Sequence, residues 1–164
     1  MGNASGPMHD PSVLTPTDAN ALNQAAQNVF NNPTPDAAQQ FSNSVQAWVN
    51  SSSALKAAAT SGDFAVDPAG GQAYVDAYNT CLSKLPEMNR KIRTLIGEYK
   101  LGTSPGAKLV APWNLQVAQE LKTAFDQLET VYSNARDAYS AAMKNYKENE
   151  ENVTVSLRQV ADQT

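Results

Sequence analysis

The sequence has few of the side chains that most enzyme chemistry needs. Among its 164 residues there is one histidine, His9, and one cysteine, Cys81. A single cysteine cannot form an intramolecular disulfide, and these two residues cannot supply a zinc site or a nucleophile–histidine arrangement. We therefore expect no catalytic residues, no cofactor and no bound metal, and we expect that the protein is not an enzyme.

Charge is also scarce. Charged residues make up 17% of the chain, the net charge is −4 and the pI is about 4.9. Because phosphate contacts need clustered Lys and Arg, this composition argues against a nucleic-acid partner. It argues equally against a basic patch that binds anionic membranes. No apolar run approaches the ~18 residues that a membrane-spanning helix needs.

The first 16 residues lack the features of a secretory signal peptide. They have no basic start and no apolar stretch, and they are rich in Gly, Pro, Asn and Ser. We predict that residues 1–16 are a disordered tail. Export, if it occurs, is then expected to follow a leaderless route.

Residues 17–60 are predicted to form a polar segment with two helices. The first is capped by Thr17 or Asp18 and ends near Phe30, before the breaker at 31–35. The second covers about 36–59. One apolar stripe runs along it, made of Phe41, Val45, Trp48, Ser52 and Leu55. Its other faces are mostly Gln, Asn, Ser and Ala, so this helix needs a partner surface.

Residues 63–164 are predicted to form an antiparallel helical hairpin that resembles a coiled coil. Asp67 and Pro68 begin its first helix, and Gly102 and Pro105 lie in the loop that ends it. Spacings of four and three define a seam of Tyr74, Tyr78, Cys81, Leu85, Met88, Ile92, Leu95 and Tyr99. On this seam we interpret Cys81 as a buried small apolar residue. We expect Pro86 to kink this helix without dividing it.

The second hairpin helix is predicted to begin near Pro112 and Trp113. Its seam consists of Val117, Leu121, Ala124, Leu128, Val131, Ala135, Ala138 and Ala142, and it continues through Tyr146 and Glu150. The fold class is therefore all-α. One hairpin buries little apolar area, so its remaining surface needs the 36–59 helix, a second copy or another hairpin.

A short pattern near the C-terminus bears on function. The stretch Tyr146-Lys147-Glu148-Asn149-Glu150 follows an Ala-rich helix. Together with Phe64–Gly71 and Leu101–Pro105 upstream, it resembles the helical-hairpin proteins associated with type VII (ESX) secretion in actinobacteria. The resemblance covers about 63–160. The Trp-x-Gly turn of the small secreted hairpins is absent, because Trp48 and Trp113 are followed by other residues.

The resemblance implies that Tyr146 and Glu150 form a Tyr-x-x-x-Glu secretion signal read by the type VII machinery. It also implies export of a folded protein, to the medium or the cell surface, with a helical partner protein. Four residues separate Tyr146 from Glu150, so one docking surface can bury the ring and pair the carboxylate. The alternative is that Tyr146 is a core aromatic at the end of the seam.

Other interpretations of the chain remain open. Trp48 and Trp113 are candidate partner-binding residues, although for Trp113 we favour a role in locking the loop against the helices. The chain could instead be an intracellular coiled-coil adaptor or structural protein that forms a homo-oligomer through the seam. A third hypothesis is a helical targeting segment of a toxin system.

Overall fold

A computed structural model of the chain describes residues 16–98 and 102–161, and within these ranges every regular element is a helix. The helices are α1 (Pro16–Asn31), α2 (Pro35–Ser61), α3 (Pro68–Glu98) and α4 (Pro105–Ala161). The prediction of an all-α fold is confirmed. The predicted tail, apart from Pro16, and the seam residue Tyr99 lie outside the described residues, as does the side chain of Leu95.

The helix ends follow from local capping chemistry. The Thr34 hydroxyl accepts a hydrogen bond of 3.2 Å from the Ala37 amide, and Pro35 fills the first position of α2. Gly62 ends α2 with φ of 89°, a conformation that favours glycine. Asp67 begins α3 by accepting a 3.0 Å hydrogen bond from the Gly70 amide, as the sequence predicts.

The predicted start of the last helix near Pro112 is wrong. The helix α4 begins at Pro105, and the Ser104 hydroxyl caps it by accepting from the Ala107 amide at 3.2 Å. Pro112 lies inside the helix, where its side chain is exposed. A proline there removes one backbone hydrogen bond, and an exposed helix can leave the freed carbonyl to water. Pro86 likewise lies within a single α3, as expected.

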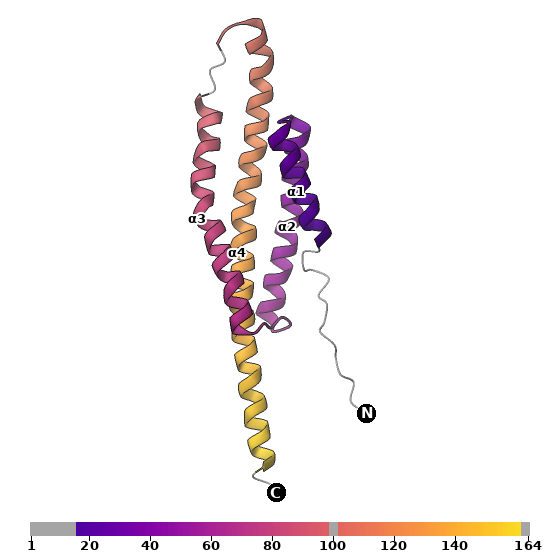
Figure 1. The fold of residues 1–164 in the computed structure, drawn as a ribbon, viewed down its shortest axis with the longest axis vertical. Helices are drawn as coiled ribbons and strands as arrows, with labels where there is room; N and C mark the ends of the chain where they lie inside the picture. The colour runs from indigo at the N-terminus through magenta and orange to yellow at the C-terminus, as the bar shows by residue number, and fades with distance from the viewer. Residues whose placement is uncertain (1–15, 99–101, 162–164) are drawn as a thin grey trace.

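Helix α4 is the centre of the fold. It packs against α2 and against α3, whereas α1 packs against α2 (Figure 1). The predicted hairpin of α3 and α4 is present, and the 36–59 helix supplies the further apolar surface that this hairpin needs. The buried core draws on all four helices, with Val29 from α1, Val45 from α2, Leu85 from α3 and Leu128 from α4.

Helices α2 and α4 run in the same direction. Polar pairs join them at a constant separation of 81 residues, as in Gln46–Gln127, Ser53–Asn134 and Lys56–Asp137. A constant separation means that both chains advance together, which is the register of a parallel helix pair. Small residues line the lower part of this contact, and Ala59, Ala138 and Ala142 are almost fully buried there. The two backbones can therefore approach closely.

The predicted α4 seam is confirmed, because all its members from Val117 to Ala142 are buried except the half-buried Leu121. The α3 seam is displaced. Tyr74 and Met88 are exposed, and Cys81 is half-buried rather than buried. Leu85 and Ile92 of the predicted seam are buried as expected, and the stripe that faces the core also includes Val75, Leu82, Asn89 and Ile96. The buried polar Asn89 interrupts the apolar pattern, which is why the sequence indicated a neighbouring stripe.

Aromatic rings fill the contact between the first half of α3 and α4. Tyr74 stacks on Tyr139 with ring centroids 4.5 Å apart, and Phe64 meets the same ring edge-on at 5.5 Å. Tyr78 lies between Tyr139 and Tyr132, about 6 Å from each ring (6.1 and 6.2 Å). Such pairs add to the stability that area burial provides. They explain why this half of α3 packs on α4 despite the exposed side of Tyr74.

The close packing of α2 on α4 predicts that position 138 tolerates only a small side chain. Replacing Ala138 with Leu should destabilise the protein by about 1–3 kcal/mol or more, because the added carbons have no space between α2 and α4. Urea unfolding followed by circular dichroism measures this loss. The control is Ala77→Leu on the exposed face of α3, which should change the free energy of unfolding by less than about 0.5 kcal/mol. Equal effects of the two changes would contradict the α2–α4 packing.

The tyrosine cluster predicts alkaline unfolding. Burial disfavours the phenolate and raises the pKa of Tyr78, Tyr132 and Tyr139, that of Tyr139 to about 12. An unfolded tyrosine has a pKa of ~10, so the stability that these residues contribute is complete below pH ~10 and is lost as pH rises towards the folded pKa. Between pH 10 and 12 the wild type should therefore lose more stability than a Tyr139→Phe variant. Identical pH slopes would contradict the burial of this phenol.

Candidate functional site

The candidate site lies where α4 leaves the helical body. The segment joining α2 to α3, residues 62–67, passes beside α4 just before Tyr146. Asn145 holds this segment, because its side-chain amide donates to the carbonyls of Ala59 at 2.7 Å and Phe64 at 2.9 Å. The Val66 amide also donates to the Ala142 carbonyl at 3.3 Å. We call residues 62–67 together with Asn145 the collar.

The start of α3 closes the other side of this junction. Gly71 is buried, and a Cβ atom built on it would lie 2.5 Å from Cγ of Met143. A larger residue here would force the Met143 side chain to move, so glycine permits this close approach of α3 to α4. The collar and Gly71 together fix the position of α4 one turn before the Tyr-x-x-x-Glu pattern.

Tyr146 and Glu150 interact with each other on the surface of α4. Tyr146 is half-buried and Glu150 is exposed. Hydrogen bonding to the Glu150 carboxylate, then the negative charge of Glu150, burial and the charge of Asp67 raise the pKa of Tyr146. The expectation of one helix face is met. Because the ring is half-buried, both the exposed signal and the core aromatic at the end of the seam stay predictions.

Beyond Tyr146 the helix extends past the ends of the other described helices. Every described side chain from Lys147 to Ala161 is exposed, and Figure 1 shows this part of α4 projecting below the other helices. Val153 and Leu157 are 59% and 65% exposed. They lie seven and eleven residues after Tyr146, which places all three on one side of the helix. We call Lys147–Ala161 the projecting helix.

The two tryptophans lie far from this site in the fold. Trp48 is half-buried on α2, and its indole N–H is buried without a hydrogen-bond acceptor among the described residues. Trp113 is 57% exposed near the start of α4, beside the exposed Leu109 and Val110. The interpretation that Trp113 locks the loop against the helices is therefore wrong. Partner binding by Trp48 and Trp113 stays a prediction.

Sequence reasoning missed the collar. Asn145 is one of many asparagines in this chain, and nothing in its sequence context marks it as a residue that bridges two carbonyl groups. Its role depends on Phe64 and Ala59, which lie 81 and 86 residues away along the chain. The Gly70-Gly71 pair was the available signal, because paired glycines at a helix entry can indicate close backbone approach.

Metal-binding groups do not assemble in the described part of the chain. No three His, Cys, Asp or Glu side chains there lie close enough to hold a metal ion. His9 lies outside the described residues. Across the same ranges, no helix has the length and apolar content needed to cross a bilayer.

We compared the chain with known protein families, curated proteins and solved structures. No known protein family, curated protein or solved structure matches this chain.

The collar predicts a specific role for Asn145. Replacing it with Ala should destabilise the protein by about 2 kcal/mol, because two carbonyl groups lose a side-chain donor in a partly buried site. Urea unfolding measures the loss. Asn149→Ala, four residues further along the exposed helix, is the matched control and should lie within about 0.5 kcal/mol of the wild type. Equal stabilities of the two variants would show that the collar does not hold α4.

Proposed function

We propose that this chain is a non-enzymatic type VII secretion substrate or secretion-associated protein, recognised through Tyr146 and Glu150. The observation that carries the proposal is the position of this pair. It lies at the point where α4 leaves the collar, so a receptor can reach both side chains without opening the core.

The pair offers two kinds of contact in one place. The half-buried Tyr146 ring presents an apolar face, and Glu150 presents a carboxylate one turn away. A receptor with an apolar pocket beside an Arg or Lys could bind both. Binding would exchange the interaction between Tyr146 and Glu150 for contacts of both side chains with the receptor.

The collar supports recognition of the folded protein. Because Asn145 anchors α4 immediately before the motif, the motif has a defined orientation relative to the helical body. The projecting helix extends this surface through Val153 and Leu157, which are exposed and apolar. A helical partner protein that packs on these residues would bury them alongside the motif. Under this proposal the exported protein reaches the medium or the cell surface.

Export from an actinobacterial host with a type VII pathway tests the proposal. Tyr146→Ala and Glu150→Gln should each reduce the amount of exported protein to a small fraction of the wild-type amount, while the cellular amount stays unchanged. The matched control is Glu148→Gln, which removes the same charge from an exposed position on the same helix. It should be exported normally.

Thermal unfolding of the purified variants separates recognition from stability. Glu150→Gln and Glu148→Gln change exposed side chains, so their free energies of unfolding should remain within about 0.5 kcal/mol of the wild type. Tyr146→Ala removes a half-buried ring and should cost about 1–3 kcal/mol, which leaves the protein folded. Normal export of both Tyr146→Ala and Glu150→Gln would overturn the proposal.

A second candidate function is a structural protein that oligomerises through α4. Exposed apolar residues at both ends of this helix favour it, namely Leu109 and Trp113 at one end and Leu157 at the other. Sedimentation distinguishes the two functions. A stable homodimer that Leu157→Glu dissociates, combined with export that does not depend on Tyr146, would support the oligomerisation function instead.

A further inference from the structure

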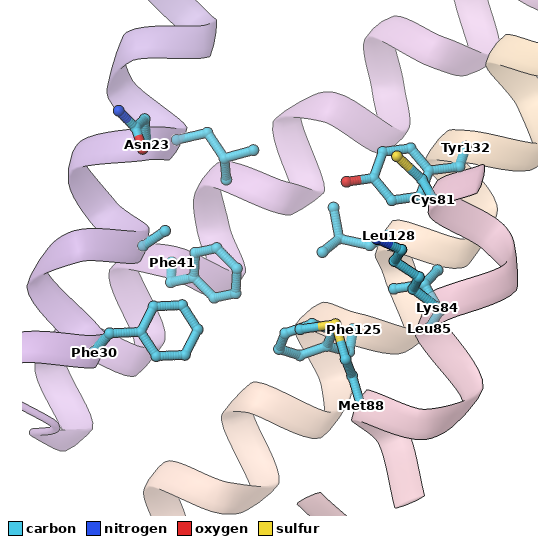
Figure 2. Close-up of a pocket in the computed structure, with 12 residues that line it drawn as sticks. Asn23, Phe30, Phe41, Cys81, Lys84, Leu85, Met88, Phe125, Leu128 and Tyr132 are labelled. Atoms are coloured by element: carbon cyan, nitrogen blue, oxygen red, sulfur yellow. The ribbon is translucent and has the colours of Figure 1, made fainter. Parts of the chain in front are cut away.

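A groove separate from the projecting helix lies between α1 and α3. Figure 2 shows α1 on one side, with Phe30, and α3 on the other, with Leu85 and Met88. Phe125 and Leu128 of α4 also line it. The groove has a volume of about 400 Å³. It exists because α1 packs on α2 and α3 packs on α4, so that α1 and α3 do not meet.

The surface of the groove is almost entirely apolar. Phe41, Leu85, Phe125 and Leu128 are buried members of the main core that also line it. At its mouth Phe30 is 62% exposed and Met88 is 39% exposed. Large apolar side chains that remain in water around a preformed apolar hollow are typical of a ligand site.

One formal charge faces this apolar surface. Lys84 lines the groove on α3, and no Asp or Glu is among the described residues that line it. Lys84 makes no ion pair with any described residue, whereas Lys91, two turns further along α3, pairs with Glu87 at 2.9 Å. Because Lys84 is exposed, its ammonium group is available to a ligand at the rim.

We propose that this groove binds an anionic amphiphile with a single alkyl chain, with the chain lying against Phe125 and Leu128 and the carboxylate paired with Lys84. The volume lies near the lower end of the ~300–1,000 Å³ that is usual for small-molecule sites. An α-helix of a partner protein is ~10 Å wide, so a groove of this size favours a single alkyl chain over a helix. Because Lys84 is the one charged side chain among the described residues that line the groove, we expect the head group of the ligand to be negatively charged. This site is independent of the proposed export function.

Titration calorimetry of the purified chain with decanoate tests the site. Wild-type protein should bind decanoate and should bind decyltrimethylammonium, which has the same chain and the opposite charge, more weakly. Lys84→Gln should weaken decanoate binding roughly two- to fivefold, the effect of losing an exposed ion pair. Lys91→Gln is the matched control on the same helix and should bind like the wild type.

Two further measurements locate the ligand. Met88→Trp should weaken decanoate binding by more than about tenfold, because the indole ring would occupy the mouth of the groove. Cys81, the only cysteine, also lines the groove, so decanoate should slow its alkylation by iodoacetamide. This second readout needs no substitution, so it remains decisive even if the Met88 variant does not fold.

Several results would overturn the proposal. They are the absence of decanoate binding by the wild type, equal affinity for the two amphiphiles, unchanged affinity in Lys84→Gln, and unprotected Cys81. Sedimentation adds one more. A wild-type dimer that Met88→Trp dissociates would mean that a second copy of the chain occupies the groove.

Discussion

The Ala-rich stripe of α4 determines how the other helices can be arranged. Ala138 and Ala142 are fully buried against Ala59, and small side chains at these positions let the α2 and α4 backbones approach closely. Close approach brings polar side chains on the flanks within hydrogen-bond distance, which produces the regular pairs such as Lys56–Asp137. Since α2 occupies one side of α4, α3 must pack on another side. The connection between α2 and α3 therefore has to pass beside α4, and this is the collar.

The length of α4 follows from the same arrangement. At ~1.5 Å per residue its 57 residues span roughly 85 Å, far more than the 27 residues of α2 or the 31 of α3. Its two ends consequently extend past its neighbours, where Trp113 and Leu157 stay exposed. In an ordinary core such residues would be buried. Here they lie on surfaces that a receptor, a helical partner or a second copy of the chain can reach.

The two proposed binding surfaces differ in physical character. The Tyr146–Glu150 pair is a convex feature on a single helix, so its affinity must come from a receptor that encloses it. The groove beside Lys84 is concave and already has a packed apolar floor, so a small ligand can lose its water there without rearranging the protein. Asn145 matters for the first surface and has no contact with the second. The two surfaces can therefore be disrupted separately.

Local chemistry determined much of this protein from the sequence alone: the helical fold class, the cap at Asp67, the α4 seam and the spacing of Tyr146 and Glu150. These features depend on residues within one or two helical turns, so the pattern of side chains predicts them. Only the tertiary structure decided that α2 lies parallel to α4, that Asn89 rather than Met88 faces the core, and that Asn145 closes the collar. Those outcomes depend on contacts between segments that lie far apart in the chain. The shape of the facing surface decides which helix face is buried, and no local pattern of residues encodes that shape.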